Sequence, residues 1–156
     1  IAALFANAFH TITRYLPLPV IFETPTLKQL VEEDSHIQRI IEMGRQANLA
    51  IFTVGTVKED TLLFKLGYLG AEEKNDLQQH AVGDICSRFF DAEGHISNES
   101  INSRTVGIDL EELRKKEKSI LVAGGEDKVR AIKAALTGGY ANTLITDQYT
   151  ARALLE

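Results

Sequence analysis

The sequence predicts an α/β fold built on a mostly parallel sheet, and two observations lead to this prediction. Short apolar runs rich in β-branched residues alternate along the chain with segments whose apolar residues recur at helical spacing. The last third, residues 119–156, holds two complete strand-to-helix units, in which the strands stop at Gly124 and at Asp147. Strands that alternate with helices in this way form parallel sheets with helices packed on their faces.

The N-terminal part of the chain begins with a helical pattern over residues 2–10. We expect Ile12–Leu16 to form a strand. Pro17 and Pro19 then enforce an extended passage as far as Phe22, because proline fixes its own φ and disfavours the helical region for the residue before it.

Two helices and a strand are expected next. Thr24 followed by Pro25 is typical of an N-cap with proline at the first helical position, and Ser35 is expected to cap a second helix. The apolar face of this second helix comprises Ile37, Ile40, Ile41 and Met43. Leu49–Val54 is a continuous apolar run that predicts a buried strand, and Gly55 ends it.

The middle of the chain is more polar. Ala71–His80 predicts a polar helix, Asp91–Gly94 a hairpin turn, and Thr105–Ile108 a short strand. A charged surface helix is expected to begin at Asp109 or Leu110 and to end at Glu117.

The C-terminal third completes the sheet. Ser119–Ala123 and Thr143–Thr146 predict strands, each followed by a helix, of which the first covers Asp127–Leu136. We expect Leu49–Val54, Ile120–Ala123 and Thr143–Thr146 to lie side by side as parallel strands whose carboxyl ends share one edge of the sheet.

That edge is where α/β sheets bind their ligands. Gly124 and Gly125 expose backbone N–H groups where the dipole of the following helix is positive, and Lys128 can add a full charge in the first helical turn. These features favour a phosphate, and therefore a phosphorylated small molecule. The alternative is that the two glycines only allow a tight turn and that the lysine is solvated.

Three further polar residues flank the predicted strands. Thr56 could contact a phosphate or a sugar, or it could equally cap a helix. Asp84, which we expect in a turn after Gly83, could accept hydrogen bonds from sugar hydroxyls or could only stabilise its loop. Asp147 is expected mainly to cap the last helix.

Composition narrows the range of functions. The net charge of −5, the pI near 5.4 and the lack of a basic stripe argue against direct contact with nucleic acid. The single cysteine, Cys86, cannot form an internal disulfide and is expected to be a buried core residue. Neither a signal peptide nor a membrane-spanning apolar run is visible, so we expect a cytoplasmic protein without membrane partners. The four histidines are scattered and no nucleophile motif is present, so no metal, cofactor or catalytic set is predicted.

Three stretches of the chain carry a resemblance to a known family. They are VGDICSRFFDAEGHI from residue 82, RTVGIDLEELR from residue 104 and SILVAGGEDKVRAIKAALTGGYANTLITDQYTARALLE from residue 119. They resemble the effector-binding domain of the SorC family of bacterial sugar-responsive transcription regulators. The earlier stretches LPLPVIF and HIQRIIEMGRQANLAIFTVGTV match that pattern in order, so the resemblance covers nearly the whole chain.

The resemblance implies a Rossmann-like three-layer sandwich, similar in fold to glucosamine-6-phosphate deaminase and ribose-5-phosphate isomerase. It also implies a repressor-type sensor without enzymatic turnover, whose effector is a phosphorylated sugar, with deoxyribose 5-phosphate as the best guess. A separate N-terminal helix-turn-helix domain would bind operator DNA, and the regulator would be a homodimer or a homotetramer. A sugar-phosphate isomerase or deaminase on the same fold is the alternative.

The resemblance also implies roles for individual residues. Lys128 would contact the phosphate, and Asp84 would contact sugar hydroxyls. The full set of expected effector-binding residues is Gly55, Thr56, Asp84, Arg104, Gly124, Gly125 and Lys128. In the family the effector domain starts well before the point that matches Ile1, with a strand and a polar loop that supply much of the phosphate cradle. We therefore expect residues 1–156 to be the C-terminal part of one effector-binding domain, with an incomplete site.

Overall fold

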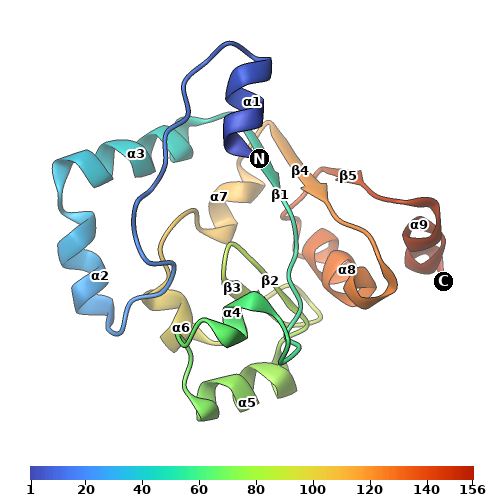
Figure 1. Cartoon of the computed structure of the whole chain (residues 1–156). Helices are drawn as coiled ribbons and strands as arrows, with labels where there is room; N and C mark the ends of the chain where they lie inside the picture. The colour runs from blue at the N-terminus through green and yellow to red at the C-terminus, as the bar shows by residue number, and fades with distance from the viewer.

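A computed structural model describes all of residues 1–156 and shows a mixed α/β fold with a parallel sheet at its centre (Figure 1). The sheet has the strand order β1 (Leu49–Phe52), β4 (Lys118–Val122) and β5 (Thr143–Ile145). Both pairings are parallel, with Leu49 opposite Lys118 and with Ile120 opposite Thr143. The prediction that these three segments lie side by side as parallel strands is therefore confirmed.

A second sheet is the antiparallel hairpin of β2 (Gly83–Ile85) and β3 (Arg88–Phe90), which the sequence did not predict. Cys86 and Ser87 form its two-residue turn, and both have positive φ, 51° and 66°. Such a turn has the twist that tight hairpins require, and it holds its residues at the tip. Two predictions are therefore wrong: Cys86 is exposed rather than buried in the core, and Asp84 belongs to a strand rather than to a turn.

Helices and one 3₁₀ turn make up the rest of the regular structure. No helix has the length and apolar character that crossing a bilayer requires. The elements are α1 (Ala2–Ala8), α2 (Pro25–Glu32), α3 (Ser35–Gln46), α4 (Leu62–Lys65), α5 (Ala71–His80), α6 (Glu99–Ser103), α7 (Leu110–Arg114), η1 (Glu126–Lys128), α8 (Val129–Thr137) and α9 (Gln148–Leu155).

The starts of α2 and α3 test the predicted caps. The hydroxyl of Thr24 accepts a hydrogen bond from the Leu27 N–H at 3.1 Å, with Pro25 at the first helical position, as predicted. The predicted cap Ser35 is wrong by one residue, because the Asp34 carboxylate accepts the N–H groups of the second and third helical residues at 2.9 and 3.1 Å. Ser35 consequently becomes the first residue of α3.

Two predicted strands are absent. Ile12–Leu16 is irregular, since no neighbouring strand pairs with it, and Ile12 is 72% exposed. Thr105–Ile108 contributes only one isolated bridge, from Thr105 to Ile21. The carbonyls of this second segment are taken instead by the side chain of Arg88, which removes the acceptors that a strand partner would need.

The buried side chains form two clusters, and the β2–β3 hairpin is the wall between them. Phe90 packs into the larger cluster with Leu121 and Ile132, beneath the parallel sheet. Phe89, one residue earlier, packs into the smaller cluster with Leu77. Neighbouring strand residues face opposite sides, so one short hairpin serves both cores.

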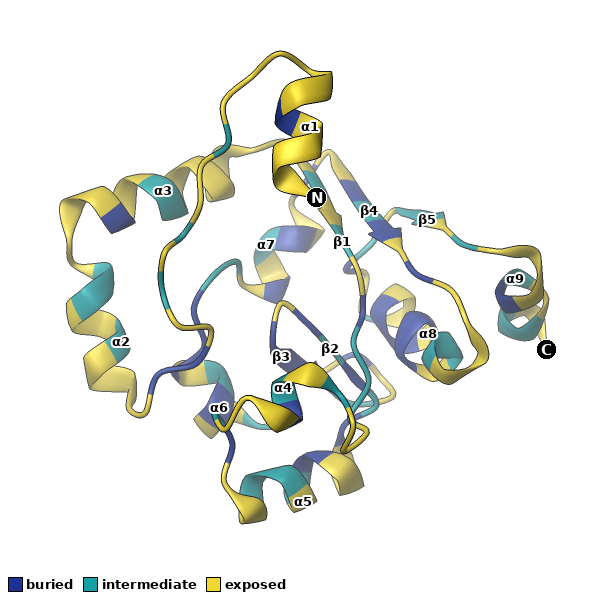
Figure 2. Ribbon diagram, in the orientation of Figure 1, coloured by how far each residue is buried: buried dark blue, intermediate teal, exposed yellow.

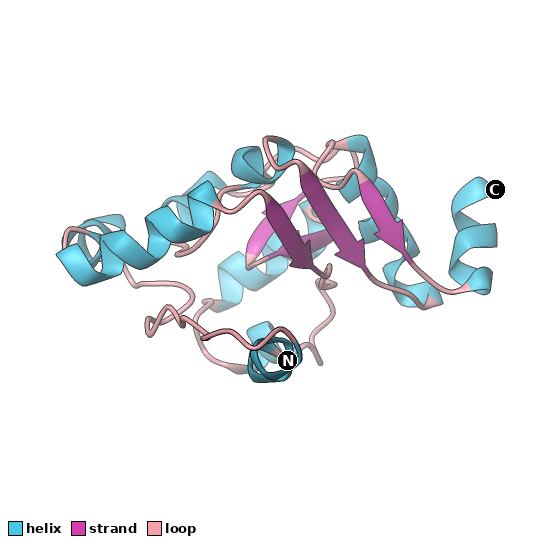
Figure 3. Cartoon of the chain, turned by 90° about the horizontal axis from the view of Figure 1, so that it is seen from above, coloured by secondary structure: helices cyan, strands magenta, loops and turns pink.

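The parallel sheet is covered unequally on its two faces. Helices α7 and α8 lie on one side, and α1 lies on the other (Figure 3). On the α1 side, apolar residues of all three strands remain about half exposed (Figure 2): Leu49 47%, Ile51 49%, Val122 41% and Ile145 54%. The prediction that Leu49–Val54 is a fully buried strand is therefore wrong for one of its faces, and regular pairing ends at Phe52 because Gly55 turns to pair with Asp84.

Lys116 explains why α7 ends three residues before the predicted Glu117. Its side chain is 6% exposed, and its ammonium group donates to the carbonyls of Gly44 at 2.9 Å and Arg45 at 2.5 Å. These carbonyls lie in the last turn of α3, where a cation meets the negative end of the helix dipole. Lys116 thus leaves its own helix to cap another one.

Arg88 is the most heavily bonded buried side chain. The guanidinium donates to the carbonyl of Ile108 at 2.8 Å and to Asn102 Oδ1 at 2.6 Å, and it pairs with Asp109 at 2.7 Å. It reaches the carbonyl of Gly107 as well, at 3.3 Å. Burial lowers the pKa of Arg88, and the Asp109 carboxylate opposes that change. One side chain therefore replaces a strand as the hydrogen-bond partner of residues 102–109.

Replacing Arg88 with methionine should lower the free energy of unfolding by about 3–5 kcal/mol, because several buried carbonyls would lose their only side-chain donor. Urea unfolding followed by circular dichroism measures this change. The control is Arg39→Met on the exposed face of α3, which should shift stability by no more than about 0.5 kcal/mol. Equal effects of the two substitutions would contradict the role given to Arg88.

Candidate functional site

The carboxyl ends of the three parallel strands share one edge, and the predicted site residues follow those ends. Gly55 and Thr56 come after β1, Gly124 and Gly125 after β4, and Asp147 after β5. The β2–β3 hairpin brings Asp84 to the same edge, since the Gly55 N–H donates to the Asp84 carbonyl at 2.9 Å. The structure thus gathers residues that are up to 92 positions apart in the sequence, from Gly55 to Asp147.

The Asp84 side chain is held by its own hairpin. Its Oδ2 accepts the Ser87 N–H at 2.9 Å, so the predicted loop-stabilising role is confirmed. Its Oδ1 accepts no hydrogen bond within the protein and lies directly above Gly55, only 2.0 Å from where a Cβ would stand. Burial raises the pKa of the Asp84 carboxyl, while the Ser87 N–H and the charge of Lys128 act in the opposite direction. Asp84 therefore combines a free acceptor oxygen with a nearby cation.

The turn after β4 has the backbone that the two glycines allow. Gly125 has φ +105°, a value at which any residue with a Cβ would be strained. Its N–H donates to Thr150 Oγ1 at 2.8 Å. The N–H groups of Gly124, Glu126 and Asp127 donate no hydrogen bond within the protein. Lys128 is half-buried and ends η1, immediately before α8 begins. The turn thus presents unpaired donors and a cation beside a helix N-terminus.

Asp147 caps α9, as predicted. Its Oδ1 accepts the N–H groups of Tyr149 and Thr150, each at 2.9 Å, and its Oδ2 accepts the Thr150 hydroxyl at 2.7 Å. These hydrogen bonds, those from Thr150 first, lower the pKa of Asp147. The same Oδ2 lies 2.3 Å from where a Cβ of Gly124 would stand, so the cap also requires a glycine at position 124.

Thr56 lines a hollow of about 740 Å³ between the loop after β1, the end of α5 and η1. No helix begins at Thr56, since the next one, α4, has Thr61 at its N-cap, so the capping alternative for Thr56 is wrong. Lys58 and Asp127, which both line this hollow, form an ion pair at 2.5 Å. The loop after β1 is thereby tied to the turn after β4.

Arg104 makes its contacts elsewhere. It is 8% exposed, and its guanidinium donates to the Phe22 carbonyl at 2.8 Å and to Glu73 of α5 at 2.5 Å. These partners lie beside the smaller hydrophobic cluster, not among the residues that follow the strands. The structure therefore gathers six of the seven predicted residues and places Arg104 apart from them.

Sequence reasoning missed Thr146 and Thr150. The Thr146 hydroxyl is buried without a hydrogen-bond partner, 3.6 Å from where a Cβ of Gly124 would stand. Thr150 is the third residue of α9, and its contact with Gly125 spans 25 positions. The only local signal is the D-x-x-T spacing from Asp147, which indicates a helix cap and says nothing about the glycine turn.

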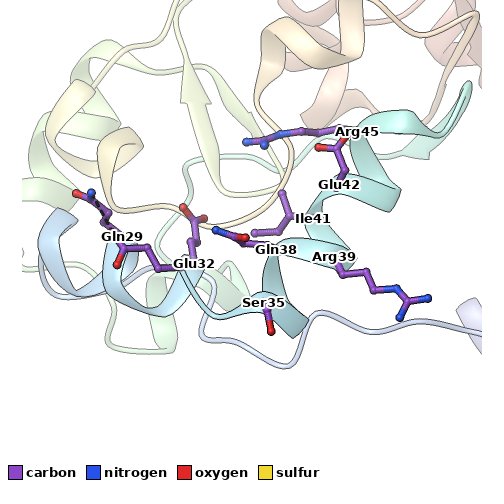
Figure 4. A pocket seen from close by; sticks show the side chains of 9 residues that line it. Gln29, Glu32, Ser35, Gln38, Arg39, Ile41, Glu42 and Arg45 are labelled. Atoms are coloured by element: carbon purple, nitrogen blue, oxygen red, sulfur yellow. Dashed lines mark hydrogen bonds between the residues drawn. The ribbon is translucent and has the colours of Figure 1, made fainter.

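Another polar hollow, of about 640 Å³, lies between α2 and α3 (Figure 4). Its side chains are mostly exposed and include acidic and basic residues, and Ser35 and Arg39 point away from Glu32 and Gln38 (Figure 4). None of the strand-end residues lines it. Ligand sites need convergent polar groups, so this hollow is the weaker candidate.

Comparison with known proteins adds independent findings. The model of the family described as "Putative sugar-binding domain" matches residues 1–156. The deoxyribonucleoside regulator of Bacillus subtilis (strain 168) is 63% identical over 152 residues, which are 97% of this chain and 49% of that protein. The sorbitol operon regulator of Klebsiella pneumoniae is 31% identical over 139 residues, 88% of this chain and 44% of that protein. The chain thus spans about half the length of these curated relatives.

Solved structures show the same fold. A transcriptional regulator from Streptococcus pneumoniae TIGR4 superposes with a TM-score of 0.91 at 26% identity, over 99% of this chain and 59% of that one. The full-length sorbitol operon regulator SorC from Klebsiella pneumoniae superposes with a TM-score of 0.87 at 29% identity, over 97% of this chain and 49% of that one. By name the first is a transcriptional regulator and the second an operon regulator.

Asp84→Asn should make the protein more stable at neutral pH, because the pKa of Asp84 is raised in the folded state. An acid with a raised pKa binds its proton more tightly when folded, so the wild type should lose stability as the pH rises from the ordinary aspartate value through the raised one. Asparagine removes this loss. Urea unfolding at a series of pH values tests the expectation.

Asp147→Asn serves as the control of opposite sign. Hydrogen bonds lower the pKa of Asp147, so this substitution should destabilise the protein at neutral pH, and its effect should shrink as the pH falls through the lowered value. If Asp84→Asn instead destabilises the protein at neutral pH, as Asp147→Asn is expected to do, the environment described for Asp84 is contradicted.

Proposed function

The chain belongs to the sugar-binding domain family found in bacterial transcriptional regulators, and we propose that it senses a phosphorylated sugar. In this proposal residues 1–156 are the C-terminal part of one effector-binding domain, and deoxyribose 5-phosphate is the effector. The choice of sugar is supported by the 63% identity to a protein named deoxyribonucleoside regulator. Operator DNA would be bound by a separate N-terminal domain of the intact regulator.

The observation that carries the proposal is the turn after β4. Three unpaired N–H groups, of Gly124, Glu126 and Asp127, precede the positive end of α8, and Lys128 stands beside them. Backbone donors at a helix N-terminus, together with a cation, are the usual partners of a phosphate. We therefore propose that the effector phosphate binds between this turn and the Lys128 ammonium group.

Asp84 suits the other end of the effector. Its free Oδ1 lies at the strand edge, and the charge of Lys128 acts on this carboxyl by opposing the rise in its pKa. An ionised carboxylate accepts hydrogen bonds from sugar hydroxyls. Gly55 and Thr56 would line the pocket beneath the sugar. Arg104, whose guanidinium is already bonded to Glu73, would affect the effector only through its neighbours.

The relatives are regulators of transcription rather than enzymes, which supports a sensor. An isomerase or deaminase would need an acid and a base that converge on one sugar. Asp84 is one such group, but Asp147, which follows the neighbouring strand β5, is engaged in capping α9. We propose that effector binding controls the operator affinity of a cytoplasmic regulator.

Lys128→Ala should weaken the affinity for deoxyribose 5-phosphate by roughly tenfold to a hundredfold, because a charge-assisted contact to phosphate contributes about 1.5–3 kcal/mol. Titration calorimetry of the intact regulator measures the effect. Lys133→Ala, on the exposed face of α8, is the matched control and should leave the affinity unchanged. If both variants bind as tightly as the wild type, Lys128 does not contact the phosphate.

The intact regulator should form at least a dimer in solution. Proteins that bind two operator half-sites are symmetric oligomers, since each half-site needs its own copy of the DNA-binding domain. Light scattering with and without deoxyribose 5-phosphate tests this expectation. A monomer under both conditions would exclude the proposed homodimer or homotetramer.

A further inference from the structure

We infer that Thr150 is a positioning residue of the effector site, which shapes the Gly124-Gly125 turn without touching the effector. The inference rests on the proposed binding of a sugar phosphate at that turn. Thr150 is 2% exposed and belongs to α9, so it acts from behind the turn. Its hydroxyl accepts the Gly125 N–H at 2.8 Å and donates to Asp147 Oδ2 at 2.7 Å.

This hydroxyl links the Gly125 N–H to the Asp147 carboxylate, and the shape of the turn depends on both. Gly125 has φ +105° and ψ 145°, one of many conformations open to glycine, so holding the turn in it requires support from a neighbouring contact. The hydrogen bond from its N–H to Thr150 supplies that support and occupies the Gly125 donor. The N–H groups of Gly124, Glu126 and Asp127 on the same turn are unpaired, so they depend on the shape of this turn for their directions.

Asp147 completes the arrangement from the same helix end. Its Oδ2 accepts the Thr150 hydroxyl and lies against Gly124, in the space that a Cβ would fill. The first turn of α9 thus contacts both glycines, one through Thr150 and one through Asp147. The start of α9 therefore acts as a template for the phosphate turn.

Substitution of Thr150 with valine or with serine distinguishes the effect of its hydroxyl group from the effect of its shape. Valine has nearly the same volume but can neither accept from Gly125 nor donate to Asp147, whereas serine keeps both hydrogen bonds. Thr105 offers a matched control, since it is fully buried and its hydroxyl donates to the Ile101 carbonyl at 2.8 Å, apart from the strand ends. Thr105→Val removes one buried hydrogen bond elsewhere in the same protein.

The test is titration calorimetry of the intact regulator with deoxyribose 5-phosphate, after circular dichroism has shown that each variant is folded. Thr150→Val should weaken binding on the order of tenfold, because the turn would lose the stabilisation that about one hydrogen bond contributes. Thr150→Ser and Thr105→Val should bind like the wild type. In a Lys128→Ala background, Thr150→Val should weaken binding by a smaller factor than it does in the wild type, because both changes affect the same phosphate contact.

The outcomes separate this inference from the proposed function. A wild-type regulator that does not bind deoxyribose 5-phosphate would refute the choice of effector. A wild type that binds, together with Thr150→Val that binds equally well, would overturn the role of Thr150. If Thr150→Val does not fold, Asp147→Asn decides instead: weakened binding supports the template, and wild-type affinity overturns it.

Discussion

The buried guanidinium of Arg88 is the interaction on which the rest of the structure depends. It hydrogen-bonds with the backbone and side chains of residues 102–109 in place of a strand, and it does so from the first residue of β3. The hairpin is thereby fixed as the wall between two hydrophobic clusters. Asp84 lies on the other strand of that hairpin, so its position at the sheet edge depends on the buried charge of Arg88 as well as on its own backbone pairing with Gly55.

At the sheet edge, glycines make room for carboxylates. Asp84 Oδ1 occupies the space beside Gly55 where a Cβ would lie, and Asp147 Oδ2 does the same beside Gly124. The two pairs stand at the ends of neighbouring parallel strands, β1 and β4. In both places the glycine is required because it has no side chain rather than because its backbone is flexible. Even a methyl group there would displace the carboxylate from its position. The only alternative would be a shift of the loop itself.

Much of the fold could be predicted because its signals are local. The apolar runs identified the three parallel strands, and short polar side chains before helices identified the caps at Thr24 and Asp147. The hairpin turn at Cys86 and Ser87 escaped prediction, because it has positive φ without the glycine or asparagine that usually indicates it. The exposed face of β1 escaped as well, since an apolar run does not reveal which face is covered. Lys128 was predicted from its place after the Gly-Gly strand end and Asp84 from its place after Gly83, and the family resemblance implied the same roles, whereas Thr150 matters only through a contact that folding creates.

The exposed tip of the hairpin makes the effector site accessible to spectroscopy. Cys86 is the only thiol in these 156 residues, and it is separated from Asp84 by a single residue. A fluorophore attached there would sit beside the carboxylate proposed to hold the sugar, and its emission would respond to changes in that environment. Partial desolvation, followed by the charge of Asp84, raises the pKa of the thiol, so attachment requires a more alkaline buffer than an ordinary cysteine does, because the thiolate is the reactive form.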